Sequence, residues 1–225
     1  MPARLFLILP ALVISATASA GEWPGPLEAA LAASTDGPLY AYEMIYDDGE
    51  VRAEGTVDVS QPEGQRIIVT SPAEDQWPEG FAEGLADMDA EADGDIWCAD
   101  FEENVPGDVT LLEEDETTAT YGFTPNPDAD ADNAERKMFR NLKGTITVAK
   151  DQPAVLGFHL WAEKSFKPMI IARINVFDMA ISCERAPDGR TYAQAFNINV
   201  EGSAMGQAFS ERESRMITRL LRPIE

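Results

Sequence analysis

Apolar and polar side chains alternate with a period of two over most of the second half of the chain. Four runs of this kind follow one another between residues 143 and 200, with turn-forming residues between them. In the first run, Ile146 and Val148 fall on one face, and the threonines beside them fall on the other. Because successive side chains of a strand point to opposite faces, the pattern predicts long antiparallel strands. The segment 187–189, Pro-Asp-Gly, predicts a tight turn, since proline presets φ and glycine adopts positive φ.

The first half of the chain repeats the alternation in shorter runs. These runs predict strands at residues 39–46, 51–59, 66–71, 109–112 and 118–123. An Asp-Gly pair at residues 48–49 predicts a hairpin turn between the first two. Residues 204–222 fit either a helix or one or two final strands. We favour strands there, because the preceding meander would continue to pair.

Three short segments have the spacing of helices rather than strands. They are residues 24–34, 78–88 and 133–142. The second is amphipathic, with Phe81, Leu85 and Met88 on one face. The sequence therefore predicts a mainly β (α+β) protein: a curved antiparallel sheet or half-barrel, with short helices covering its concave face. Residues 21–225 are expected to form a single domain that carries an acidic insert at 72–116.

The first 20 residues have the composition of an export signal. Arg4 is followed by an apolar run over residues 5–14 and then by Ala18-Ser19-Ala20, an A-x-A cleavage site. The run is about half as long as a membrane-spanning helix requires. We therefore expect a signal peptide cleaved after Ala20, and a mature protein in the bacterial periplasm.

The chain contains two cysteines, Cys98 and Cys183. Export would place them in an oxidising compartment. Two lone cysteines in an oxidising compartment predict one structural disulfide. A redox-active pair is the alternative, but the C-x-x-C spacing that lowers a thiol pKa is missing.

Charge is distributed unevenly. Residues 21–135 carry 31 acidic and 2 basic side chains, whereas residues 136–225 carry 9 acidic and 14 basic ones. A chain with a net charge of −23 does not favour nucleic acid, whose phosphates require lysine and arginine. The asymmetry fits either a solvated acidic surface or an acidic rim opposite a weakly basic sheet.

Residues 89–100 match part of a calcium-binding EF-hand loop. The candidate ligands at positions 1, 3, 5 and 12 of that loop are Asp89, Glu91, Asp93 and Asp100. Gly94 falls at the turn position, and oxygen-rich loops of this spacing bind Ca²⁺. The loop lacks the bidentate glutamate and a following helix, so weak calcium binding and a solvated acidic loop are both retained as interpretations.

The apolar face of the long strands is a candidate ligand cavity. Its predicted lining residues are Phe158, Leu160, Ile174, Val176, Phe196 and Ile198, with Val200 beside them. Alternation alone does not distinguish an open cavity from a packed core, so the second interpretation is kept.

Little in the sequence points to catalysis. The only histidine, His159, is expected to be a surface or packed residue, and neither a G-x-S-x-G nor an H-E-x-x-H motif occurs. Carboxylates are numerous, but none forms a recognisable pair. We predict a protein that is not an enzyme, with Ca²⁺ as the only candidate cofactor.

The segment from Leu142 to Val148 and the long paired runs after it, together with the hairpin at 39–59, resemble the periplasmic lipoprotein-carrier superfamily (LolA/LolB-like). The resemblance implies an open half-barrel that carries lipid or lipoprotein acyl chains on its concave face, with membrane-associated donor and acceptor proteins as partners. The buried arginine that latches the lid of these carriers has no clear counterpart, and Arg66 and Arg173 are the candidates. A calcium-binding exported interaction protein with a packed sheet is the alternative function, and an envelope hydrolase is a third.

Overall fold

The structure is a computed structural model, and it describes residues 23–33, 36–127, 131 and 133–224. The predicted signal peptide lies outside these residues. The described residues form eleven strands, three α-helices and two 3-10 helices. The helices are α1 (Gly25–Leu31), η1 (Glu74–Gln76), α2 (Phe81–Glu91), η2 (Cys98–Asn104) and α3 (Asn133–Phe139). The strands are β1 (Leu39–Asp47), β2 (Arg52–Val57), β3 (Ile67–Ser71), β4 (Thr110–Glu114), β5 (Thr118–Phe123), β6 (Leu142–Ala149), β7 (Ala154–Ala162), β8 (Phe166–Met169), β9 (Ala172–Arg185), β10 (Thr191–Ala204) and β11 (Gln207–Ile224).

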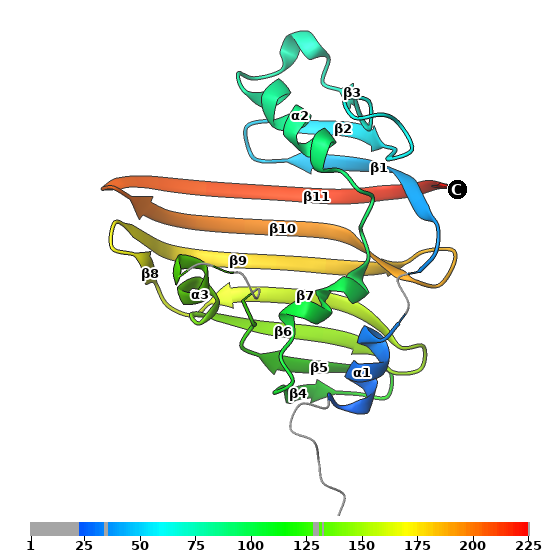
Figure 1. Cartoon of the computed structure of the whole chain (residues 1–225), viewed down its shortest axis with the longest axis vertical. Coiled ribbons are helices and arrows are strands. Elements are labelled where there is room, and N and C mark those ends of the chain that lie inside the picture. The colour runs from blue at the N-terminus through cyan, green and yellow to red at the C-terminus, as the bar shows by residue number, and fades with distance from the viewer. Residues whose placement is uncertain (1–22, 34–35, 128–130, 132, 225) are drawn as a thin grey trace, which may run out of the picture.

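All eleven strands belong to one antiparallel sheet (Figure 1). Its order is β3-β2-β1-β11-β10-β9-β7-β6-β5-β4, and the short β8 pairs with β9. The three longest strands, β9, β10 and β11, lie in the middle. The sheet stays open, with β3 and β4 at its edges. The predicted meander over 143–200 and the mainly β fold class are confirmed.

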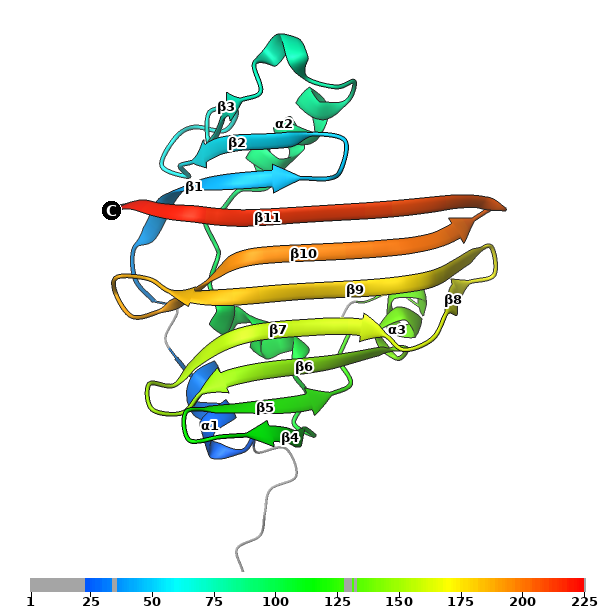
Figure 2. The same cartoon turned by 180° about the vertical axis from the view of Figure 1, so that it is seen from behind.

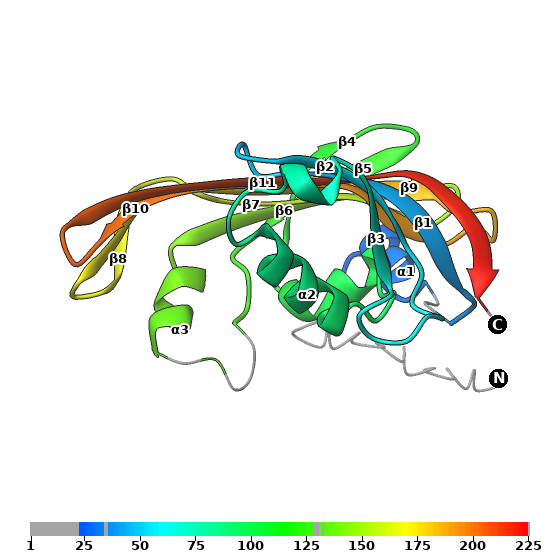
Figure 3. The ribbon, with the colours of Figure 1, turned by 90° about the horizontal axis from the view of Figure 1, so that it is seen from above.

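The three α-helices lie on one face of the sheet, and the sheet bends toward them (Figure 3). We call this the concave face. The opposite, convex face is the one toward the viewer in Figure 2, where the helices lie behind the strands. The prediction that short helices cover the concave face is therefore confirmed.

The main core lies between α1, η2 and the strands β5, β6 and β7. Leu27 of α1 and Ile146, Val148 and Val155 of the strands are completely buried there. The alternation seen in the sequence explains this, because every second residue of β5 and β6 is buried. Burial of a leucine, isoleucine or valine side chain stabilises by about 1.5–3 kcal/mol.

Several element boundaries differ from the prediction. The ambiguous segment after residue 204 is a single 18-residue strand, β11, which pairs with both β10 and β1. The third predicted helix stops at Phe139, and Leu142 instead begins β6, where its side chain is buried. The second begins at Phe81, because Gly80 has a φ of 84° and cannot belong to the helix. Strand pairing determines the first two of these differences, and the backbone conformation of Gly80 determines the third.

One irregularity changes which face of β9 is apolar. The register between β9 and β10 shifts between the pairs Val176–Glu201 and Ile174–Gly202, leaving Asn175 as an extra residue. Such a bulge reverses the alternation beyond it. Ile174 therefore joins the concave face with Phe177, whereas Val176 lies on the convex face.

Candidate ligand-binding site

Two of the six residues predicted to line the cavity are buried. Phe158 and Leu160 are only 3% and 4% exposed, and the ring of Phe101 in η2 stacks on Phe158 with their centroids 5.0 Å apart. The acidic insert thus folds over this part of the concave face. Phe158 and Leu160 therefore lie in the packed core, which is the second interpretation that the alternating pattern left open.

The other predicted lining residues remain partly accessible. Ile174, Phe196 and Ile198 are half-buried on the concave face and pack against the edge of the core, beside Met179 and Val200. We call these five residues the concave strip. Val176 is not part of the strip, since the bulge at Asn175 places it on the other face.

A groove lies next to this strip, between α2 and the sheet. It has a volume of about 360 Å³ and is bordered by β1, β2, β3 and β11. Its α2 wall consists of Phe81, Gly84, Leu85 and Met88, and its floor includes Met44, Tyr46, Ala53, Gly55, Ile67 and Val69. The amphipathic spacing that predicted the helix therefore places its apolar face toward the sheet. We call this space the α2 groove.

The C-terminal end of α2 is anchored to the β2–β3 hairpin. The buried Asp89 carboxylate accepts hydrogen bonds from the backbone N–H groups of Gly64 and Ile67. In return, the Arg66 guanidinium donates to the carbonyl oxygens of Asp89, Ala90 and Ala92. A cation is favourable at the C-terminus of a helix, where backbone carbonyls lack partners.

The N-terminal end of α2 is held by aromatic contacts. The Phe81 ring meets Trp77 edge-on at a centroid distance of 5.2 Å and lies 6.5 Å from Tyr46 of β1. The helix is therefore fixed to the sheet at both ends, and the groove runs beneath it. Arg66 was one of the two candidates for a latch, and here it secures the helix that forms the groove wall.

Polar groups mark the boundary between the α2 groove and the concave strip. Arg215 forms an ion pair with Glu213, and its guanidinium carbon lies 5.8 Å from the centroid of the Phe196 ring. Burial raises the pKa of Tyr46 to about 12, helped by the negative charges of Glu213 and Asp48. Burial also raises the pKa of Tyr42 to about 12. The Tyr46 phenol, which lines the groove, is neutral at physiological pH.

The predicted calcium site is not assembled. Asp89 and Glu91 belong to the last turn of α2, and Asp89 is occupied by backbone N–H groups. Asp93 accepts a hydrogen bond from the N–H of Asp95. Within the described residues, no group of three or more His, Cys, Asp or Glu side chains could hold a metal ion. The difference arises because α2 continues through Asp89 and Glu91, the first ligand positions of the predicted loop. In a helix, these carboxylates do not converge on one point as they would in a calcium-binding loop.

We therefore expect Asp89→Ala to destabilise the protein equally with and without Ca²⁺. The change leaves the N–H groups of Gly64 and Ile67 without their acceptor; Gly64 is exposed and can bond to water, whereas an unsatisfied buried N–H, at the half-buried Ile67, costs at most about 1–3 kcal/mol. Glu91→Ala is the matched control, because Glu91 is exposed. Thermal unfolding with calcium and with chelator measures both. If Ca²⁺ raised the melting temperature of the wild type but of neither variant, the result would support the predicted calcium site.

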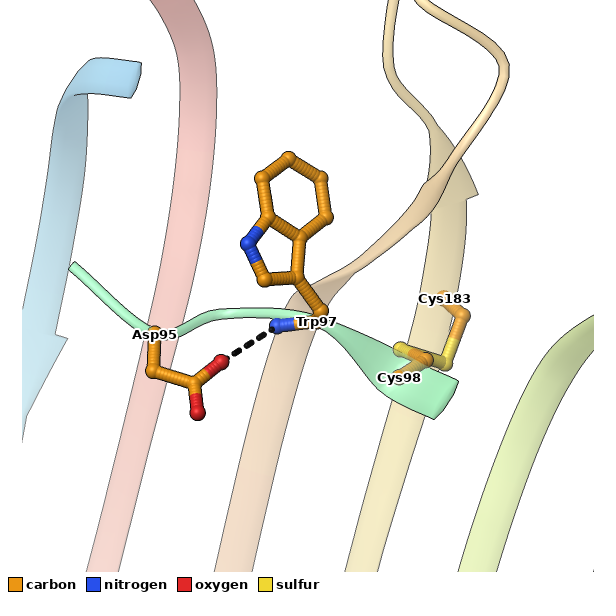
Figure 4. Close-up of a disulfide and its surroundings, with 4 residues drawn as sticks. All are labelled: Asp95, Trp97, Cys98 and Cys183. Atoms are coloured by element: carbon orange, nitrogen blue, oxygen red, sulfur yellow. Dashed lines mark hydrogen bonds between the residues drawn. A yellow bond between two sulfur atoms is a disulfide. The ribbon is translucent and has the colours of Figure 1, made fainter. Parts of the chain in front are cut away.

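The disulfide between Cys98 and Cys183 is present, as predicted (Figure 4). It joins the start of η2 to β9. Just before it, Asp95 accepts a hydrogen bond from the N–H of Trp97, and Ile96 accepts one from Ala193 of β10. The guanidinium of Arg190 lies 3.4 Å above the Trp97 ring. The insert is thus fastened across the concave face.

The remaining candidates lie away from the groove. His159 is partly exposed and bonds to Asp178 through Nε2 at 3.1 Å, while its ring stacks on Trp161. Arg173 donates to Ser165 near the turn before β9, so it does not latch a helix. The sequence interpretation of His159 as a surface residue is consistent with this position.

Most residues of the α2 groove were not identified as ligand-binding from the sequence. Phe81, Leu85 and Met88 were predicted only as the apolar face of a helix. In β2, the small residues Ala53 and Gly55 border the groove, but a Cβ at Gly55 would meet the backbone carbonyl oxygen of Ile68 at 2.8 Å, so this glycine permits the close approach of β3. Strand pairing between β1 and β11, which brings Arg215 beside Tyr46, could not be read from local pattern.

No protein-family model, curated protein or solved structure significantly matches this chain. The resemblance to lipoprotein carriers therefore rests on the arrangement of elements alone and stays a prediction. None of the helices in the described part of the chain is long and apolar enough to cross a membrane.

Proposed function

We propose that the protein is an exported, non-enzymatic carrier or binding module for the acyl chains of lipids or lipoproteins. The observation that carries the proposal is the α2 groove. An apolar helix face and an apolar strand floor face each other across about 360 Å³. This lies within the range of about 300–1,000 Å³ that is usual for small-ligand sites.

The chemistry of the groove favours a flexible apolar ligand. Met44 and Met88 provide adaptable thioether surface, which suits chains of variable shape. Charged residues, including the exposed Glu50 and Glu79, also line the groove beside these apolar side chains. The concave strip continues this surface beyond Arg215, so that a chain longer than the groove has a second apolar surface to lie on.

The architecture agrees with a binding role. Both ends of α2 are anchored, and the groove lies between the helix and the sheet. The signal-like residues 1–20 and the disulfide fit an oxidising compartment outside the cytoplasm. The packed half of the sheet, under η2, supplies a rigid support for the open half.

Native mass spectrometry of protein recovered from a membrane-containing bacterial lysate tests the proposal. We expect a population with the added mass of a lipid or fatty acid, which organic extraction removes. A protein that carries no lipid after purification, and that gains none when mixed with palmitic acid, would contradict it. Bound Ca²⁺ without lipid would favour the alternative calcium-binding function instead.

A further inference from the structure

Four exposed apolar side chains gather at one end of the sheet. Ile170 is 95% exposed, Met205 81%, Ile171 57% and Met169 48%. Met169 ends β8, Ile170 and Ile171 form the turn to β9, and Met205 lies in the β10–β11 turn. The N–H of Met205 donates to the carbonyl oxygen of Ile171 at 2.8 Å, which joins the two turns into one patch. We call these four residues the apolar tip, and Figures 1 and 3 show both turns at the same end of the sheet.

Folding does not account for this tip. Met205 has a φ of 50°, and Gly206 after it has a φ of 83°. Such turns favour asparagine or aspartate before the glycine, because a side chain at positive φ is otherwise strained. A methionine at this position destabilises the turn. Because its side chain is 81% exposed, little packing offsets that cost. Exposed apolar clusters of this kind mark interaction sites.

Basic residues are concentrated on the β8 side of the tip. α3 packs against β8, and Figure 3 shows it at this end of the sheet. The segments 133–143 and 163–173, which flank the tip, contain seven basic and two acidic residues, a net charge of +5. The basic residues are Arg136, Lys137, Arg140, Lys143, Lys164, Lys167 and Arg173. The whole chain has a net charge of −23, so this end differs sharply from the rest.

We propose that the apolar tip docks on the surface of an anionic phospholipid bilayer. The apolar side chains enter the boundary between headgroups and acyl chains, while the flanking lysines and arginines face lipid phosphates. Neither the apolar side chains nor the basic residues suffice alone, because stable membrane attachment takes both apolar burial and electrostatic attraction. The acidic remainder of the protein is repelled by the same surface, which orients the molecule with this end toward the membrane.

Vesicle flotation tests this docking directly. The protein is expressed in bacteria from its full sequence and recovered from the periplasm, and its mass is measured by mass spectrometry. It is then mixed with vesicles of phosphatidylethanolamine and phosphatidylglycerol. We expect it to float with these vesicles and not with phosphatidylcholine vesicles. High salt should release it, because screening shortens the reach of charge interactions.

Two variants separate the contributions. Ile170→Ser with Met205→Ser should lower the apparent vesicle affinity by about tenfold or more, as should Lys164→Gln with Lys167→Gln. Both pairs lie in exposed turns or beside them, so folding should not change. Ile68→Ser is the matched control, since Ile68 is 57% exposed but lies on β3 at the edge of the sheet. Ile198→Gln, in the concave strip, should float like the wild type, so this test is independent of the acyl-chain proposal.

Three outcomes would overturn the proposal. The wild type could fail to float, the Ile170 and Met205 variant could float as well as the wild type, or Ile68→Ser could lose as much binding. Dimers in size-exclusion chromatography that Ile170→Ser and Met205→Ser abolish, with no vesicle binding, would assign the tip to a second copy of this chain.

Discussion

Gly84→Leu is expected to weaken acyl-chain binding by at least about tenfold while leaving the protein as stable as the wild type or more so. Gly84 lies on the groove-facing side of α2, and a Cβ added there meets no atom within 4 Å. A leucine therefore occupies space that the ligand would use. Excluding two or three methylene groups, at about 0.8 kcal/mol each, accounts for a loss of this size.

The stability part of this prediction follows from helix propensity. Glycine inside a helix is about 1 kcal/mol less favourable than alanine, and leucine is close to alanine. Ala86→Leu is the matched control, because Ala86 is on the same helix but is exposed and outside the groove. Titration with the fluorescent fatty acid cis-parinaric acid, together with thermal unfolding, measures both properties. Equal affinity in Gly84→Leu and wild type would place the ligand elsewhere.

Removing the disulfide is expected to have the largest effect on stability. Cys98 and Cys183 are 85 residues apart, and closing a loop of this length stabilises by about 4–5 kcal/mol in the chain-entropy model. For a protein of this size, we expect Cys98→Ala with Cys183→Ala to lower the melting temperature by about 8–20 °C. The variant should also bind more of a hydrophobic dye, because η2 is no longer tied over Phe158.

The control for this variant is the reducing agent itself. Dithiothreitol should lower the melting temperature of the wild type toward that of the double variant and leave the variant unchanged. A wild type with the same melting temperature as the double variant would show that the η2 packing, and not the covalent link, holds the insert in place.

The parts of the fold that depend on local pattern were predictable from the sequence. Alternation in residues 143–200 and the Pro-Asp-Gly turn predicted long antiparallel strands, and a lone cysteine pair predicted the bridge. Competition between helix and strand in 204–222 was resolved by pairing with β1 and β10, which are distant in sequence. The face of Val176 was mispredicted because a single extra residue, Asn175, reverses the alternation.

The candidate site was harder to predict, since it depends on which segments cover which part of the sheet. Phe158 and Ile198 look alike in sequence, as apolar residues of alternating strands. The first is buried by Phe101 from the acidic insert, and the second remains half-buried. Similarly, Asp89 fits a calcium loop by spacing, yet the helix extends through it and directs its carboxylate to the backbone of the β2–β3 turn. Local spacing does not encode such long-range contacts.

The most direct test of the central claim is to map where an acyl chain binds. Wild-type protein is incubated with a diazirine-labelled fatty acid at a concentration at which the fatty acid is monomeric. The sample is irradiated and analysed by peptide mass spectrometry. We predict saturable labelling of α2 over residues 81–88 and of the facing strands β1 to β3, which an excess of palmitic acid prevents. Labelling confined to the convex face, or labelling that palmitic acid does not reduce, would contradict the account.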